Sequence, residues 1–163
     1  MAKGKGKGKG LNGDHIATNR RASFDFELGE KYEAGLSLLG SEARSLRVNG
    51  GDVSTAWVEI NQRGEAWVKE MRIPVLTHAA FAHTEKRPRK LLLHRAEIDT
   101  LRGSIERDGM TLIVTRSYFK EGRAKLEFAV ARGKKKHDKR QSLREKDENR
   151  EARQAMHRGR RSE

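Results

Sequence analysis

Apolar and polar residues alternate along much of the middle of this chain, a period that is typical of strands burying one face. The clearest case is the segment 123–130, in which the apolar positions are Ala124, Leu126, Phe128 and Val130. The apolar-rich segment 110–119 precedes it across the turn 120–122, so the two are predicted to form a hairpin. Further strands are predicted at residues 32–39, 53–60 and 66–68, the last two joined by the four-residue connection 61–64.

Two segments have helical periodicity instead. Residues 41–47 form a short predicted helix that ends before Gly50. Residues 91–107 form a longer one, whose helically spaced positions are Leu91, His94, Ile98, Leu101 and Ile105. About six short strands with a helix between the hairpins fit a small closed or partly open barrel. We therefore predict a mainly β fold with flanking helices, a small β-barrel with residues 75–88 as a surface loop.

Charge separates this body from two basic ends. The chain of 163 residues has a formal net charge of +13, of which residues 1–22 carry +5, residues 132–163 carry +7 and the remainder only +1. Lysine and glycine alternate at the start, a composition that favours disorder. We therefore predict a disordered basic arm at 1–18, a folded body at 19–131 and a basic tail at 132–163.

The tail has few apolar residues, so it cannot bury enough surface to offset its ordering entropy when it is free. It also lacks proline and is rich in helix formers, and Ser142 and Glu145 have the spacing of a capping box. We therefore expect a tail that is disordered in isolation and becomes helical, from near Leu143, on a phosphate-rich surface.

Several classes of function are disfavoured by the composition. There is no cysteine, no run of about 18 apolar residues and no apolar stretch after the basic N-terminus, so we expect a cytoplasmic protein without a membrane span or secretory signal. The six histidines lack metal-ligand spacing, and no nucleophile elbow, phosphate-binding loop or carboxylate pair is present. We expect no metal, no cofactor and no enzymatic activity. Three basic clusters, at 19–22, 86–90 and 133–140, instead favour RNA binding.

Short blocks of the sequence resemble a known family. The blocks are Asn19-Arg20-Arg21-Ala22, Glu33-Ala34-Gly35-Leu36, residues 40–47, Arg89-Lys90-Leu91-Leu92-Leu93-His94, Tyr118-Phe119-Lys120 and, in the tail, Ala131 to Lys135 with Asp138-Lys139-Arg140. In this order and approximate spacing they are similar to the signature blocks of the SmpB family of SsrA-binding proteins. The resemblance implies an OB-fold-like barrel that binds the tRNA-like domain of transfer-messenger RNA and brings it to ribosomes stalled on messages without a stop codon. A peptide-tagging reading frame on that RNA is then translated.

The resemblance also implies roles for individual residues. The RNA-binding set is Asn19, Arg20, Arg21, Glu33, Ala34, Gly35, Lys90, Leu92, His94 and Lys125. The set for the decoding centre and the messenger channel of the small ribosomal subunit is Lys134, Lys135, Lys136, His137, Asp138, Lys139, Arg140 and Met156. By pattern alone a core position is the better interpretation of Leu92, and only the resemblance favours an apolar contact with RNA. Gly35 is equally compatible with a simple bulge or with close backbone approach.

Two alternatives remain open at the level of sequence. A general RNA chaperone or ribosome-assembly factor fits the composition almost as well, and selectivity for a tRNA-like RNA would distinguish it. An RNA-processing enzyme would need a carboxylate cluster or a general base. We expect a monomer whose partners are the RNA and the ribosome.

Overall fold

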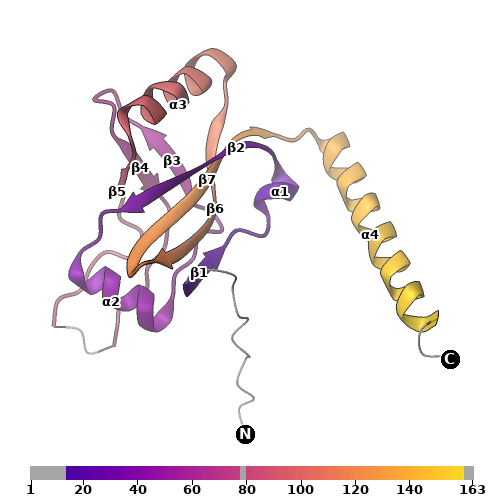
Figure 1. Ribbon diagram of the computed structural model, residues 1–163, viewed down its shortest axis with the longest axis horizontal. Helices are drawn as coiled ribbons and strands as arrows, with labels where there is room; N and C mark the ends of the chain where they lie inside the picture. The colour runs from indigo at the N-terminus through magenta and orange to yellow at the C-terminus, as the bar shows by residue number, and fades with distance from the viewer. Residues whose placement is uncertain (1–13, 78–79, 160–163) are drawn as a thin grey trace, which may run out of the picture.

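The computed structural model describes residues 14–77 and 80–159 and contains a seven-stranded antiparallel sheet with four helices (Figure 1). The strands are β1 (Asp14–Thr18), β2 (Phe26–Leu36), β3 (Trp57–Ile60), β4 (Ala66–Lys69), β5 (Arg89–Leu92), β6 (Thr111–Lys120) and β7 (Arg123–Gly133). The helices are α1 (Ala22–Asp25), α2 (Gly40–Asn49), α3 (Arg95–Asp108) and α4 (Lys136–Gly159).

The strands close into a ring. Their order is β1-β6-β3-β4-β5-β2-β7, and an additional pairing of β6 with β7 closes six of them into a ring, with β1 paired to β6. The long hairpin of β6 and β7 makes this closure possible, because β6 pairs with β7 on one side and with both β3 and β1 on the other. The prediction of a mainly β fold with flanking helices is confirmed.

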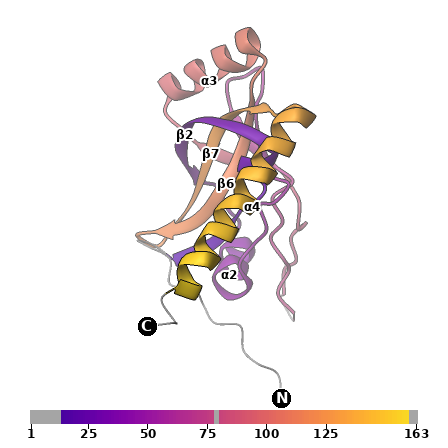
Figure 2. The same ribbon diagram turned by 90° about the vertical axis from the view of Figure 1, so that its right-hand side faces the viewer.

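The core lies inside the ring, where the predicted alternation places the apolar side chains. Leu126 and Phe128 are fully buried, and Ala124 and Val130 pack against the same cluster. The ring of Phe128 stacks on Tyr32, with centroids 5.9 Å apart. Helices α2 and α3 cover opposite ends of the ring (Figures 1 and 2).

The predicted helix at 91–107 is in fact a strand followed by a helix. Leu91 points into the core from β5, where it is paired with Leu36 and with Ala66. Helix α3 then begins after His94, whose backbone N–H donates to the Glu97 carboxylate at 2.9 Å, and ends at Gly109 with a left-handed backbone (φ 61°). The periodicity of the sequence does not separate β5 from α3, because the apolar positions of a short buried strand also fit one turn of a helix.

Several boundaries also differ from those predicted, and β2 runs from Phe26 to Leu36 where 32–39 was predicted. The sheet begins at Asp14, because β1 pairs with β6, so only residues 1–13 of the predicted arm lie outside the described residues. The strand predicted at 53–60 is ordered as β3 only from Trp57, since the carboxylate of Asp52 accepts the N–H of Ser54 at 2.8 Å and turns the chain.

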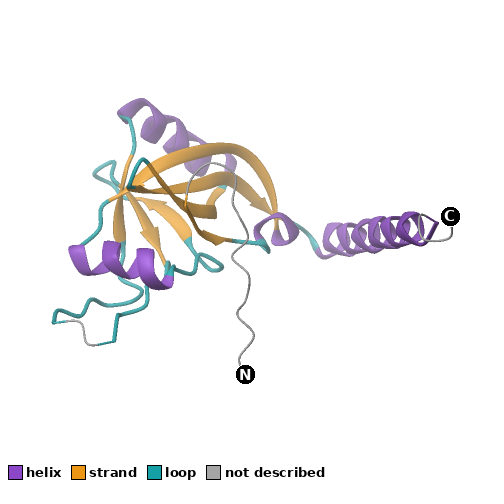
Figure 3. Cartoon of the chain, turned by 60° about the horizontal axis from the view of Figure 1, so that its bottom comes forward, coloured by secondary structure: helices purple, strands orange, loops and turns teal. Residues whose placement is uncertain are grey.

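Helix α4 projects away from the ring (Figure 3). It begins seven residues before the predicted start, and an Asp138 oxygen lies 3.3 Å from the backbone N–H of Lys135 as a cap of its first turn. Its described side chains are exposed apart from the half-buried Lys139 and Ser142. The helix therefore has no apolar face packed on the body.

Candidate RNA interface

Four strands place Tyr118, Lys125, Gly35 and Leu92 in one row on the outside of the ring. Tyr118 of β6 is paired with Lys125 of β7, Lys125 with Gly35 of β2, and Gly35 with Leu92 of β5. Directly paired residues of antiparallel strands share a face, so their side chains point outward together. Lys125, Gly35 and Leu92, which are far apart in the sequence, thus become neighbours. We call the four residues Tyr118, Lys125, Gly35 and Leu92 the outer row.

Gly35 forms the low point of this row. It pairs regularly on both sides, so the bulge interpretation is wrong at this position, and the irregularity in β2 lies between Leu28 and Lys31 instead. A Cβ built on Gly35 would come within 3.4 Å of the Leu92 side chain, in ordinary contact. Glycine here keeps the backbone accessible from outside.

A hollow of about 330 Å³ lies over Gly35, between the sheet and α2. Its walls include Leu92, which is 59 % exposed, and Arg47 of α2. The Arg47 guanidinium carbon is 5.4 Å from the centroid of the Phe119 ring, and its Nη2 donates to the carbonyl of Gly122 at 3.2 Å. The exposure of Leu92 decides against the core interpretation of this residue.

Glu33 is the acidic member of this face and is surrounded by donors. The Tyr118 hydroxyl donates to its carboxylate, the Lys120 Nζ lies 3.3 Å from Oε1, and the Lys125 Nζ lies 3.9 Å from the same oxygen. The hydrogen bond from Tyr118, followed by the lysines, lowers the pKa of Glu33 below its usual value. Burial and the bond to Glu33 raise the pKa of Tyr118 to about 12. At neutral pH Glu33 is therefore ionised and Tyr118 is a donor.

Lys90 and His94 lie at the end of the same face. Lys90 is held by the Glu65 carboxylate at 2.7 Å, and this hydrogen bond, with one from Asn61, lowers the pKa of Glu65 to about 2. The side chain of Lys90 is 43 % exposed, and that of His94 is exposed at the start of α3. Both remain accessible to a partner.

Ala34 and Asn19 are placed differently from the prediction. Ala34 is 1 % exposed and faces the core, because it alternates with its outward neighbours Glu33 and Gly35 along β2. The Asn19 side chain is 8 % exposed: its amide donates to the carbonyl of Val114, and its oxygen accepts the N–H groups of Arg21 and Ala22. Neither side chain is presented outward.

Asn19 instead fixes the turn that carries Arg20 and Arg21. Both arginines are exposed, and Arg21 Nε is 3.6 Å from Asp25 at the end of α1. The Asn19 backbone N–H also donates to the carbonyl of Thr115, three residues from Tyr118 along β6. Pairing of β1 with β6 therefore sets the position of the arginine turn on the sheet, three residues along β6 from Tyr118.

The basic cluster at 86–90 does not form one free positive patch. Arg89 is fully buried and pairs with the equally buried Glu42 at 2.8 Å, and Arg87 joins the same carboxylate at 2.6 Å. Lys86 is paired with Glu70 at 3.0 Å. Sequence alone suggested an RNA-binding cluster, but the tertiary structure uses two of its four charges, Arg87 and Arg89, to tie α2 to the ring.

The tail set is joined to the body at α1. Lys134 donates through its backbone to the carbonyl of Asp25 and through Nζ to the carbonyl of Ser23, while Lys139 Nζ lies 3.3 Å from the Asp25 carboxylate. Lys135, Arg140 and Met156 are exposed, the last by 75 %. The side chains of Lys136 and His137 lie outside the described residues.

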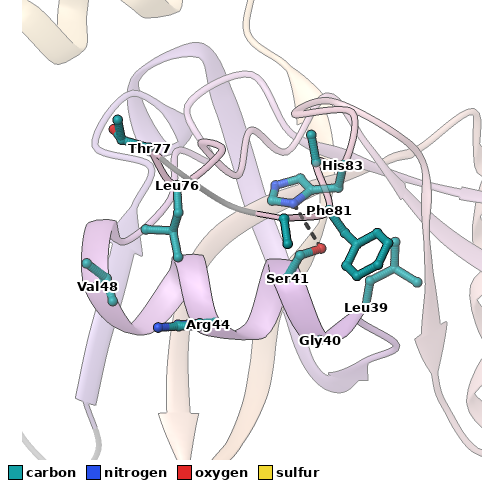
Figure 4. Close-up of a pocket in the computed structure, with 11 residues that line it drawn as sticks. Leu39, Gly40, Ser41, Arg44, Val48, Leu76, Thr77, Phe81 and His83 are labelled. Carbon is teal, nitrogen blue, oxygen red and sulfur yellow. Dashed lines mark hydrogen bonds between the residues drawn. The ribbon is translucent and has the colours of Figure 1, made fainter.

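A second hollow, of about 770 Å³, lies between α2 and the chain segment that follows Ile73 (Figure 4). His83 lines this hollow, with Nδ1 3.2 Å from the Ser41 hydroxyl and Nε2 3.0 Å from the carbonyl of Ile73. Phe81 and Val48 line it and are 83 % and 66 % exposed. None of the predicted RNA-binding residues contributes to it.

Sequence reasoning overlooked two members of the interface. The sequence indicated Tyr118 and Lys120 only as part of a family block and placed Lys120 in the turn 120–122; because β6 extends to Lys120, both lie on one face. Among the described residues, no cluster of three or more potential ligands could hold a metal ion. No helix in this described part is long and apolar enough to cross a membrane.

Comparison with known proteins identifies similar chains. A family model described as SmpB protein matches residues 16–158. An SsrA-binding protein of Sorangium cellulosum is 47 % identical over 146 residues, covering 90 % of each chain, and one of Bifidobacterium longum is 46 % identical over 142 residues, covering 86 % of this chain and 90 % of the relative. A solved structure described as "tmRNA-SmpB: a journey to the center of the bacterial ribosome" superposes with a TM-score of 0.61 at 36 % identity, covering 78 % of this chain and 93 % of that one.

Proposed function

Because the chain belongs to the SmpB family, we propose that it binds the tRNA-like domain of transfer-messenger (SsrA) RNA and delivers it to stalled ribosomes for trans-translation. It acts as a binding protein without catalysing covalent chemistry, as a monomer, in the cytoplasm where its ribosomal partner works. The family resemblance found in the sequence is confirmed by the match over residues 16–158.

The observation that carries this proposal is the outer row beside Glu33. Lys125 and Lys120 supply cations for phosphate, Gly35 allows the RNA backbone to approach the strand, and Leu92 offers an apolar surface to a sugar or base. Arg20, Arg21, Lys90 and His94 extend this surface with charge and with a planar ring. The buried side chains of Asn19 and Ala34 support this surface without contacting RNA. Asn19 fixes the turn that carries Arg20 and Arg21, and Ala34 packs β2 on the core.

The tail has a separate role in the same function. We propose that residues 133–163 enter the decoding centre and the empty messenger channel, where RNA phosphate neutralises the lysines and arginines that repel one another in the free chain. Helix α4 then represents the ribosome-bound conformation of the tail. Alone, this segment is only marginally stable as a helix, because isolated helices of this length have little stability in water. The body, which extends through β7 to Gly133, and the tail that follows it are on this proposal separate functional units.

The test compares RNA binding with tagging. The protein should bind a transcript of the tRNA-like domain more tightly than an unrelated hairpin of equal length at each salt concentration, because non-specific affinity is mostly electrostatic and falls steeply with salt. The same protein should support peptide tagging in a translation system stalled on a message without a stop codon. Equal affinity for both RNAs would favour a general RNA chaperone, and RNA cleavage or modification with magnesium would favour an enzyme.

A matched pair of variants sharpens the test. Lys125→Ala removes a cation from the outer row and should weaken the binding of the tRNA-like RNA. Lys146→Ala removes the same charge from an exposed position of α4 and should leave that binding almost unchanged. If both variants bound the RNA equally well, the outer row would not be the RNA interface.

A further inference from the structure

The lysines of the proposed interface are held by a relay of side chains across three strands. Tyr118 of β6 donates its hydroxyl hydrogen to Glu33 of β2, and the same carboxylate receives Lys120 of β6 at 3.3 and 3.4 Å. Lys125 of β7 stands 3.9 Å from it. Glu33 is therefore a junction at which one tyrosine and two lysines meet.

The tyrosine is itself fixed on its other side. The guanidinium carbon of Arg116 lies 5.1 Å from the Tyr118 ring centroid, and Arg116 is anchored by two hydrogen bonds, of 3.0 and 2.8 Å, to the Glu127 carboxylate. Thr115 donates to Glu127 as well, at 2.8 Å. The Tyr118 hydroxyl is thus presented to Glu33 by groups that are already in place without RNA.

An interface of this kind needs such a support. A lysine has a flexible four-carbon stem, so an unheld ammonium group loses side-chain freedom when it meets a phosphate. A carboxylate beside phosphate contacts is repelled by RNA unless it is held against cations that offset its charge. A neutral donor that anchors Glu33 supplies that direction without adding charge.

We propose that Tyr118 is a positioning residue of the RNA interface: its hydroxyl fixes the Glu33 carboxylate, which in turn holds the ammonium groups of Lys120 and Lys125 beside Gly35. Tyr118 acts through Glu33 and not by touching the RNA with its hydroxyl. This inference rests on the proposed function, since it names what organises the same surface, and it adds Lys120 to the phosphate-contacting residues.

The test is Tyr118→Phe, measured with a transcript of the tRNA-like domain over a series of salt concentrations. The change keeps the ring under Arg116 and removes only the hydroxyl, so the thermal unfolding temperature should stay nearly the same. Affinity should fall about five-fold, the loss of one hydrogen bond that orients a charged group. The salt slope should be unchanged because no charge is lost, whereas Lys120→Ala should reduce it by roughly one.

The chain supplies a matched control. Tyr32, the other tyrosine, donates to Glu30 at 2.9 Å on the same strand, away from the outer row. Tyr32→Phe removes an equivalent bond and should leave RNA affinity within a factor of two. In a carboxyl-carbon NMR titration, the pKa of Glu33 should rise toward its usual value in Tyr118→Phe and stay low in Tyr32→Phe, which shows that Tyr118 and not Tyr32 acts on Glu33 in solution. Loss of RNA affinity at an unchanged unfolding temperature then separates positioning from a purely structural role.

Glu33→Gln provides an independent arm, because it removes the carboxylate charge and leaves Tyr118 in place. It should weaken RNA binding, and adding Tyr118→Phe to it should cause no further loss. Tighter binding by Glu33→Gln would show that the carboxylate merely opposes phosphate, and additive losses would show that Tyr118 acts without it; wild-type affinity in Tyr118→Phe overturns the inference too. If the wild-type protein itself did not prefer the tRNA-like RNA to the hairpin, the proposed function would be wrong, and that outcome is separate from these.

Discussion

The ring of strands and helix α4 are stabilised by different physics. In the ring, side chains from seven strands interdigitate around Leu126 and Phe128, and among the described residues no buried side-chain polar atom lacks a hydrogen-bond partner. Helix α4 has two large apolar side chains in its described part, Leu143 and Met156, and both are exposed. Its contacts with the body gather at the first turn, around Lys139 and Asp25.

The difference shows how one chain can carry a rigid surface and an adaptable one. The ring owes its shape to long-range burial, which fixes the outer row before RNA arrives. The helix owes its shape to local propensity, which is sufficient only when another surface removes the repulsion among its basic side chains. A change in a buried residue should therefore damage the body, and a change in backbone propensity should damage the tail.

The largest effect should come from breaking the buried ion pair of the body. Burial alone would raise the pKa of Glu42, but hydrogen bonds from Arg87 and the Leu39 N–H, with the charge of Arg89, lower it below its usual value. Glu42→Ala leaves Arg89 buried without its partner and should cost about 3–5 kcal/mol of unfolding free energy. Denaturant unfolding measures this cost.

A surface pair gives the control for that experiment. Glu70 and Lys86 are about half exposed and 3.0 Å apart, so Glu70→Ala should cost no more than about 1 kcal/mol. If the two substitutions were equally destabilising, burial would not be the cause, and the contrast between the body and exposed regions would lose its basis.

The next effect should be on the tail, with the body intact. A proline at Arg150, in the interior of α4, should cost the helix about 3 kcal/mol and abolish tagging on stalled ribosomes. Affinity for the isolated tRNA-like RNA should barely change. Arg150→Ala removes the same charge but keeps the helix, so it should retain most of the tagging; normal tagging by the proline variant would contradict folding of the tail on the ribosome.

A smaller effect should appear at the outer row. Leu92→Ala should weaken RNA binding while leaving the thermal unfolding temperature nearly the same, because the side chain is 59 % exposed. Leu91→Ala is the matched substitution one residue away, and because Leu91 is buried it should cost about 2–5 kcal/mol of stability. A cooperative loss of structure in Leu92→Ala would restore the core interpretation.

Acid should lower the stability of the body gradually. The pKa of Glu42 is lower in the folded state than in the unfolded chain, so its contribution is fully present above the unfolded value of about 4.3 and disappears as pH falls through the folded value. The unfolding temperature should thus decrease below about pH 4.3. Glu42→Gln should flatten this decrease, and an unchanged pH profile in that variant would assign the acid sensitivity to other carboxylates.

The smallest effect should follow from removing the tail. Because β7 extends to Gly133 and pairs there with Phe26, the cut belongs after Lys135 and not after Ala131. The truncated protein should lose only the α1 contacts of Lys139 and melt within a few degrees of the full chain. A large loss of cooperativity would show that α4 is part of the body's fold.

The sequence by itself determined the strands of the two hairpins and the family, but not β1 or β5. Alternation in 123–130 predicted which side chains face the core, and the ordered blocks predicted the family that the match over residues 16–158 confirmed. These features are local, since the two-residue period of a strand follows from the backbone, and order along the chain is visible without folding. The exposed helix formers of the tail likewise predicted a helix.

Only the tertiary structure decided which charges are free. It buried Arg89 against Glu42, turned Asn19 inward, and brought Tyr118, Lys125, Gly35 and Leu92 into one row. None of these relations is local, because each depends on strand register between segments that are tens of residues apart. A basic residue in a sequence has the same charge whether it binds RNA or pairs with an internal carboxylate. Which of these partners it has depends on the residues that strand pairing places beside it.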